Sequence, residues 1–138
     1  MGTDMFSLEG RTALITGSAQ GLGFTIARGM AEAGARVVLN DVVEDRLDRA
    51  VKTFRDAGLD AAGYAFDITT PADVEKGVAA IEKEAGPIDI LFNNAGIQIR
   101  HPLEEFPDEA WDRIIRINLT GMFLVGKRVA RGMIQRRR

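Results

Sequence analysis

The chain has 138 residues, which is the length of one ordinary domain. Its 18 basic and 20 acidic residues leave a net charge of −2, and a chain that is 46% apolar and 28% charged is globular, which excludes disordered and collagen-like classes. No run of about 18 apolar residues exists, so the sequence predicts no spanning helix and no membrane partner. The lack of cysteine and of a secretory signal favours a cytoplasmic protein.

Positive charge is concentrated at the C-terminus, where the last twelve residues hold six of the 18 basic residues and no acid. Such a tail can neutralise nucleic-acid phosphates, or it can place cations beside the unpaired carbonyls at a helix C-terminus. No aromatic residue interleaves with these bases to form a base-stacking surface. We therefore predict a helix end and no nucleic-acid partner.

Short apolar runs alternate with amphipathic stretches along the first two thirds of the chain. The runs predict strands over residues 11–16, 35–40, 61–66 and 88–92. The stretches between them predict helices over residues 21–33, 44–57 and 71–85, each closed by a glycine. Strands separated by helices of this length form βαβ units, whose right-handed crossovers build a parallel sheet with both faces covered. The fold class is therefore α/β, in one domain.

The last segment predicts one long helix, from residue 107 to about residue 135. Its apolar residues recur at steps of three or four on one face: Trp111, Ile115, Met122, Val125, Val129 and Met133. Asn118 falls within this apolar face. Because an unpaired buried amide costs about 1–3 kcal/mol, the spacing by itself favours a core asparagine whose amide is satisfied by neighbouring backbone.

A glycine-rich turn follows the first predicted strand directly and opens the first helix. Gly17, Gly21 and Gly23 form the pattern G-x-x-x-G-x-G. Glycine allows a sharp turn, lets backbone approach a pyrophosphate closely and lets the helix pack near the strand. The helix N-terminus then presents unpaired N–H groups to phosphates. The turn is a candidate site for a dinucleotide.

Asp41 ends the second predicted strand, 18 residues after Gly23. A carboxylate at this place accepts hydrogen bonds from both hydroxyls of an adenosine ribose and repels a 2′-phosphate, so the sequence favours NAD, with NADP as the alternative. The adjacent residues supply no cation, and Arg46 is the nearby base that could reach the carboxylate. A second interpretation makes Asp41 a cap for the helix that begins near residue 44.

Four motifs together resemble the N-terminal half of a short-chain dehydrogenase/reductase. They are the turn Thr16-Gly17-x-x-x-Gly21-x-Gly23, Asp67 after the third strand, Asn93-Asn94-Ala95-Gly96 after the fourth, and Asn118 in the long helix. The resemblance implies a Rossmann-like, doubly wound parallel sheet of strand order 3-2-1-4 with the later strands missing. Residues 1–138 would then be the N-terminal portion of a longer NAD(P)-binding domain.

The resemblance also implies roles for individual residues. The cofactor-binding set would be Gly17, Ser18, Gln20, Gly21, Leu22 and Gly23 around the pyrophosphate, Asp41 at the ribose, Asp67 and Ile68 at the adenine, and Asn94, Ala95 and Gly96 beside the adenosine half. Asn118 would have a catalytic role, distorting its helix and binding a water in the proton relay. The single histidine has no companion ligand nearby, so no metal site is expected.

Two further segments resemble the bacterial gluconate 5-dehydrogenases within this family: Phe6-Ser7-Leu8, and Gly96-Ile97-Gln98-Ile99-Arg100-His101-Pro102. They imply an oxidoreductase acting on a small polyol or sugar acid, such as gluconate or 5-keto-gluconate. Arg100 follows the fourth strand at the end where ligands bind in open α/β sheets, and its guanidinium could bind a sugar-acid carboxylate. The alternative is an exposed loop arginine.

Hydride transfer in this family depends on a serine after a fifth strand and on a Tyr-x-x-x-Lys pair. The only tyrosine, Tyr64, lies in the third predicted strand, and Ile68 stands four residues later. We therefore expect the chain to hold the cofactor-binding half, to be inactive alone, and to leave its fourth strand with an unpaired edge. The full-length parent is expected to be a homo-oligomer. A dinucleotide-binding module without chemistry, or a scaffold for another chain, is the alternative function.

Overall fold

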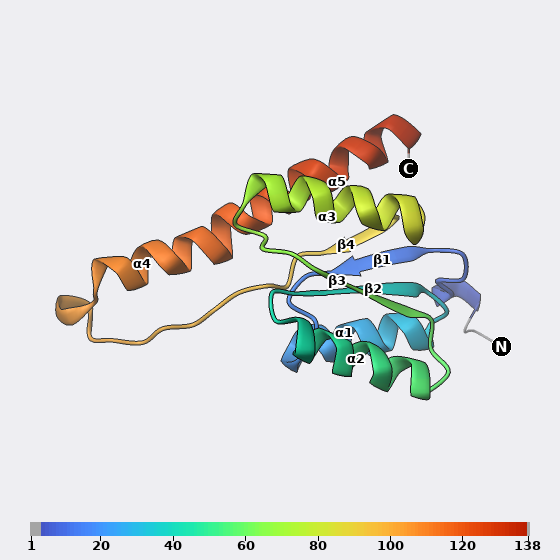
Figure 1. Cartoon of the computed structure of the whole chain (residues 1–138), viewed down its shortest axis with the longest axis horizontal. Coiled ribbons are helices and arrows are strands. Elements are labelled where there is room, and N and C mark those ends of the chain that lie inside the picture. The colour runs from blue at the N-terminus through green and yellow to red at the C-terminus, as the bar shows by residue number, and fades with distance from the viewer. Residues whose placement is uncertain (1–3, 138) are drawn as a thin grey trace.

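The computed structural model describes residues 4–137, in which four parallel strands form one sheet (Figure 1). The strands are β1 (Thr12–Ile15), β2 (Arg36–Asp41), β3 (Ala61–Ala65) and β4 (Ile90–Phe92). Their order across the sheet is β3-β2-β1-β4, and each neighbouring pair is parallel. Both the α/β class and the predicted strand order are confirmed.

Three helices connect the strands, as predicted. They are α1 (Gly21–Glu32), α2 (Glu44–Asp56) and α3 (Pro71–Glu84). The C-terminal part contains a 3₁₀ turn (Leu103–Glu105), α4 (Asp108–Ile115), a π-helical segment (Arg116–Gly121) and α5 (Met122–Arg136). Another 3₁₀ turn, Asp4–Phe6, precedes β1. No helix among residues 4–137 is long and apolar enough to cross a membrane.

Two apolar cores lie on opposite faces of the sheet, because successive side chains of a strand point to opposite faces. Ile15 and Leu39 face α1 and α2, where Phe54 is buried with them. Leu14 and Val38 face the other layer, which α3 and α5 form (Figure 1). Strands buried on both faces explain why the sequence shows continuous apolar runs at β1 and β2.

The long C-terminal helix predicted from residue 107 is not uniform along its length. A π-helical segment interrupts it between α4 and α5. Its apolar face is buried only in α5, where Val125 and Val129 are inaccessible, whereas Trp111 in α4 is 57% exposed. The apolar face of the predicted helix is therefore exposed along α4. The reason is positional: α4 extends past the end of the sheet, where nothing in the described residues covers it (Figure 1).

Candidate functional site

The carboxyl ends of the four strands meet at one edge of the sheet and open onto a cleft of about 780 Å³. This volume is within the range of about 300–1,000 Å³ that is usual for ligand pockets. Most residues predicted to bind a cofactor line it, together with the predicted catalytic asparagine: Gly17, Gln20, Gly21, Leu22, Asp41, Asp67, Ile68, Asn94, Ala95, Gly96 and Asn118. Segments separated by up to about a hundred positions in the chain are therefore brought to one place.

Three predicted residues do not line the cleft. Ser18 is fully buried, and its hydroxyl donates to the Ile15 carbonyl at 2.7 Å. Gly23 is also buried, beneath the turn. Arg100 is exposed on the loop that follows β4, where its guanidinium donates to the Gln98 side chain at 3.2 Å. Ser18 and Gly23 are thus buried residues that stabilise the turn. Arg100 lies outside the cleft.

The three glycines of the turn meet different surroundings. A Cβ added at Gly17, whose φ is 61°, would lie 2.8 Å from the Ala95 Cα, and one at Gly23 would overlap the Asn94 amide. A Cβ at Gly21, whose φ is 60°, would meet nothing within 4 Å. Gly17 and Gly23 therefore allow the loop after β4 to pack against the turn, while Gly21 leaves free space beside the cleft.

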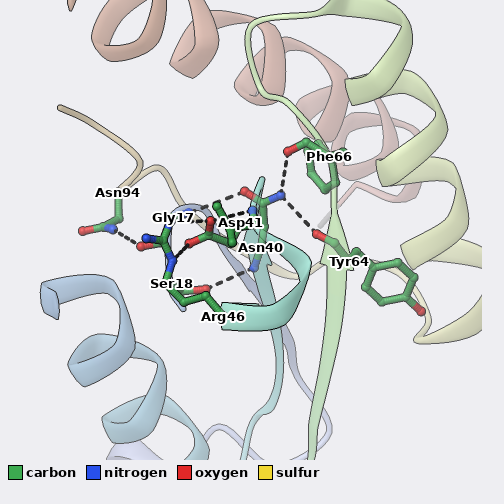
Figure 2. Close-up of polar contacts among 9 residues, drawn as sticks. Gly17, Ser18, Asn40, Asp41, Arg46, Tyr64, Phe66 and Asn94 are labelled. Atoms are coloured by element: carbon green, nitrogen blue, oxygen red, sulfur yellow. Dashed lines mark hydrogen bonds and ion pairs between the residues drawn. The ribbon is translucent and has the colours of Figure 1, made fainter. Parts of the chain in front are cut away.

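Hydrogen bonds join the turn to the loop after β4. The Thr16 hydroxyl accepts from the backbone N–H groups of Asn94 and Ala95, both at 3.1 Å. The Asn94 side-chain amide donates to the carbonyl of Thr16 at 3.1 Å. It also donates to the carbonyl of Gly17 at 3.0 Å (Figure 2). The sequence assigned no separate role to Thr16. In the structure its hydroxyl holds the ends of β1 and β4 together.

Asn40 performs the equivalent function for the ends of β1, β2 and β3, and sequence reasoning missed it. Its side chain is buried, and its amide donates to the carbonyls of Tyr64 at 3.1 Å and Phe66 at 3.2 Å (Figure 2). Its backbone carbonyl accepts from the Ser18 N–H at 2.9 Å, and its N–H donates to the Ser18 hydroxyl at 3.1 Å. The sequence does contain a signal for this role: an asparagine directly follows the apolar run 37–39, so its amide is expected to be buried.

The N-terminus of α1 faces the cleft with its first-turn N–H groups unoccupied by side chains. Its N-cap residue, Gln20, makes no side-chain capping bond, and the first turn contains no acidic residue. By contrast, α2 begins with Glu44 and Asp45 in its first turn. Unpaired N–H groups and the helix dipole favour an anion at α1, whereas the two carboxylates oppose one at α2. The turn thus fits the phosphates of a nucleotide.

Asp41 is nearly buried, with 6% of its surface exposed, at the end of β2. Arg46 does reach it: Nη2 donates to Oδ1 at 2.7 Å and Nε donates to Oδ2 at 3.2 Å (Figure 2). The Val43 N–H also donates to Oδ1, at 3.0 Å. Asp41 is not the N-cap of α2, which is Val43, although its Oδ1 binds the Val43 N–H immediately before the helix. Asp41 instead forms a bidentate ion pair at the cleft wall.

The segment after β3 forms the wall of the cleft next to Asp41. Asp67 Oδ1 accepts from the N–H and the hydroxyl of Thr69, both at 2.8 Å, which holds the turn before α3. Ile68 is 5% exposed and packs so closely on Gly121 of the π-helical segment that a Cβ there would lie 2.6 Å from Ile68 Cδ1. Ile68 next to the Asp67 carboxylate suits a nucleobase, whose ring faces are apolar and whose edges are polar.

Asn118 lies in the π-helical segment and holds the loop after β4. Its Oδ1 accepts from the Ile97 N–H at 2.8 Å, and its Nδ2 donates to the Ile97 carbonyl at 2.9 Å. A Cβ on Gly96 would lie 3.4 Å from Asn118 Oδ1, so the two segments are in close contact. The amide of this half-buried residue is therefore bonded on both sides to backbone of the loop, and the helix is distorted where the family resemblance implied.

Tyr64, the only tyrosine, does not line the cleft. Its hydroxyl donates to the Glu84 carboxylate at 2.9 Å, on the side of β3 that faces α3. Burial raises the pKa of Tyr64 above its ordinary value, and the hydrogen bond and negative charge of Glu84 raise it further. Its phenol is therefore held protonated, away from the edge of the sheet where a ligand would bind.

A family model described as "short chain dehydrogenase" matches residues 11–138. The 5-keto-D-gluconate 5-reductase of Escherichia coli strain K12 is 45% identical to this chain over 134 residues, which cover 97% of the chain and 53% of the relative. The gluconate 5-dehydrogenase of Gluconobacter oxydans is 51% identical over 135 residues, with 98% and 53% covered.

A solved structure shares the fold closely. The gluconate 5-dehydrogenase from Burkholderia cenocepacia, in complex with NADP and tartrate, is 47% identical with a TM-score of 0.93, and the match covers 99% of this chain and 53% of that one. The chain spans about half the length of the curated relatives it matches. By its matched residues, its strand order and its cleft, the chain belongs to the short chain dehydrogenase family.

Proposed function

We propose that the chain forms the NAD(P)-binding half of a dehydrogenase that interconverts a sugar acid or polyol and its keto form, such as gluconate and 5-keto-gluconate. The observation that carries this proposal is the cleft at the carboxyl ends of the strands, where the open N-terminus of α1 faces the same space as Asp41. The similarity to a 5-keto-D-gluconate 5-reductase and to a gluconate 5-dehydrogenase supports the substrate class.

Each part of the cleft suits a part of the dinucleotide. The first turn of α1 and the free space at Gly21 would hold the pyrophosphate, since N–H groups there have no side-chain partner. Asp41 would hold the adenosine ribose, and Asp67 with Ile68 would contact the adenine. The loop 94–96 would form the wall beside the adenosine half. The nicotinamide ring of the bound cofactor would itself donate or accept the hydride.

Asn118 and Arg100 are proposed to act on the substrate side. Two hydrogen bonds to Ile97 leave the Asn118 amide one N–H and one acceptor lone pair, enough to hold a water of a proton relay. Arg100 offers a guanidinium that suits a sugar-acid carboxylate, on the loop that Asn118 holds. A homo-oligomeric, cytoplasmic parent is part of this proposal, and the exposed apolar side chains of Trp111, Leu119 and Phe123 support self-association.

The cofactor part is tested by titrating the chain with NADPH and NADH and following the fluorescence of the bound nucleotide and the heat of binding. We expect saturable binding. If neither nucleotide binds at millimolar concentration, the cofactor assignment is wrong. We also expect the chain alone to reduce no 5-keto-gluconate, because the serine and the Tyr-x-x-x-Lys pair are not among its 138 residues.

The substrate part is tested with a chimera in which residues 1–138 replace the matching half of the Gluconobacter oxydans gluconate 5-dehydrogenase, to which they are 51% identical. We expect gluconate-dependent reduction of NAD(P). A second chimera carries Arg100→Gln. This substitution should raise the KM for gluconate, while the KM for the nucleotide stays unchanged and serves as the internal control. A chimera that binds nucleotide but ignores gluconate would contradict the substrate class.

A further inference from the structure

We propose that a second copy of this chain pairs with the open edge of β3, so that the two sheets join into one across a two-fold axis. Within residues 4–137, β3 is the last strand on its side of the sheet, and its outer edge has no neighbouring strand. No residue of β3 lines the cleft. The inference therefore goes beyond the proposed function, which assigns no role to β3.

The backbone of β3 directs successive residues to opposite sides, toward β2 or toward the open edge. The Val37 N–H donates to the Asp60 carbonyl at 2.9 Å, and the Asn40 amide donates to the Tyr64 carbonyl at 3.1 Å. These two carbonyls face β2. The N–H and C=O groups of residues 61, 63 and 65 therefore face the open edge.

Two of these three edge residues are free to pair with another strand. The Ala61 carbonyl accepts from Arg55 Nε at 3.1 Å, whereas Gly63 and Ala65 are exposed. Native edge strands are usually protected by charged residues, proline or a bulge. The sequence of β3, Ala-Ala-Gly-Tyr-Ala, contains no charged residue and no proline. The outer edge of β3 thus offers two residues of unprotected backbone.

An antiparallel two-fold arrangement uses these free groups. Gly63 of one copy would exchange two hydrogen bonds with Ala65 of the partner subunit, and the axis repeats this pair. Tyr64 would then lie opposite Tyr64 of the partner subunit, in a pair without backbone hydrogen bonds between the copies. Pairing in this register leaves the bond from Arg55 to Ala61 intact.

A hollow beside β3 leaves room for the two tyrosine rings. It has a volume of about 360 Å³ and lies between the end of β3 and α3, where Tyr64, Phe66, Gly77 and Ala80 line it. The Tyr64 hydroxyl donates to Glu84 at the end of α3, so the ring leans toward the start of its own strand. In an antiparallel pair this direction leads to the corresponding hollow of the partner subunit.

Charges on α2 match the same two-fold axis. Four exposed charged residues follow one another at steps of three or four on one side of the helix: Glu44, Asp48, Lys52 and Arg55. The first two are acidic and the last two basic, although Lys52 also pairs with Asp56. Arg55 reaches the Ala61 carbonyl, so this side of α2 lies at the edge of β3. In an antiparallel pair the acidic start of one helix faces the basic end of the other, and this charge complementarity identifies a second copy as the partner.

The first experiment is sedimentation velocity of the chain at micromolar concentration, with circular dichroism to verify folding. We expect a dimer for wild type and about tenfold or more weaker dimerisation for Arg55→Glu, which places like charges together. The matched control Arg49→Glu changes an exposed residue on another side of α2 and should change the affinity less than about threefold. The double variant Glu44→Arg with Arg55→Glu should restore dimerisation.

A disulfide tests the register of the pair. The chain has no cysteine, so Tyr64→Cys introduces its single thiol. Opposed residues in a pair without hydrogen bonds have Cα atoms about 4.5 Å apart, which a disulfide can span. We expect Tyr64→Cys to form a cross-linked dimer on mild oxidation, seen on a non-reducing gel. Thr53→Cys, exposed on another side of α2, should stay uncross-linked.

Three results would overturn the inference: a wild type that is monomeric at about 100 μM, a dimer that Tyr64→Cys does not cross-link, or a dimer that Phe123→Asp converts to monomer. The last result would place self-association on α5, where Phe123 is 60% exposed. Nucleotide titration separates the two proposals. A monomeric wild type that binds nucleotide contradicts this inference alone, whereas a dimer that binds no nucleotide contradicts the proposed function alone.

Discussion

The cleft wall formed by β1, β2 and β3 and the projecting part formed by residues 98–107 and α4 are held in different ways. In the wall, Asn40 is 2% exposed and its amide bonds two carbonyls of the neighbouring chain segment. In the projecting part, α4 has no buried residue, and Trp111 is 57% exposed. The part of the cleft at the ends of β1, β2 and β3 is therefore fixed by contacts within residues 4–137, whereas the segment that carries Arg100 has few such contacts.

The substitution expected to have the largest effect on stability is Asn40→Ala. The substitution leaves the carbonyls of Tyr64 and Phe66 without their donor, and each buried unpaired acceptor costs about 1–3 kcal/mol, so we expect a loss of about 4 kcal/mol in the free energy of unfolding. Urea denaturation measures it. A loss below about 1 kcal/mol would mean that the amide network does not hold the strand ends.

Gly17→Ala compared with Gly21→Ala separates packing from backbone strain. Both glycines have a φ near 60°, and a left-handed alanine costs about 1–2 kcal/mol at either place. Only at position 17 does the added methyl meet Ala95, which adds about 1–3 kcal/mol. We expect a total near 3 kcal/mol for Gly17→Ala and near 1 kcal/mol for Gly21→Ala by denaturation. Equal losses would show that the turn and the loop after β4 are not closely packed.

Tyr64→Phe gives a smaller, pH-dependent effect. The raised pKa of Tyr64 means that its hydrogen bond to Glu84 stabilises the fold fully below the ordinary pKa of 10.0 and is lost as the pH rises through the raised value. We expect wild type to be more stable than the variant by about 0.5 kcal/mol at pH 7, because solvent screens this bond, and the difference to shrink above pH 10. A difference that stays constant from pH 7 to pH 11 would contradict the shift.

Trp111→Ala is expected to have the smallest effect. Because its side chain is mostly exposed and α4 packs mainly on the π-helical segment after it, the free energy of unfolding should change by less than about 0.5 kcal/mol. The measurement is the same denaturation experiment at low protein concentration, where self-association is weakest. A loss comparable to that of Asn40→Ala would remove the contrast between the wall and the projecting part.

Two regions show what sequence patterns do not reveal. The apolar spacing from Trp111 to Met133 is real, but only the α5 part of that face meets the sheet. Asn40 looked like an ordinary strand residue because its carbonyl partners follow it by 24 and 26 positions. Arg46 could be named from the sequence as a possible partner of Asp41, because it lies only five positions later, near the start of the next helix.

The sequence by itself determined the α/β class, the glycine turn and the ends of the first three helices, because periodicity, glycine placement and helix stops are local properties of a chain. Only the tertiary structure decided that Ser18 points inward, that Gly17 packs against Ala95, and that Arg46 neutralises Asp41. Those features depend on which strand ends lie side by side, and the free energy of burying polar groups with their partners selects them.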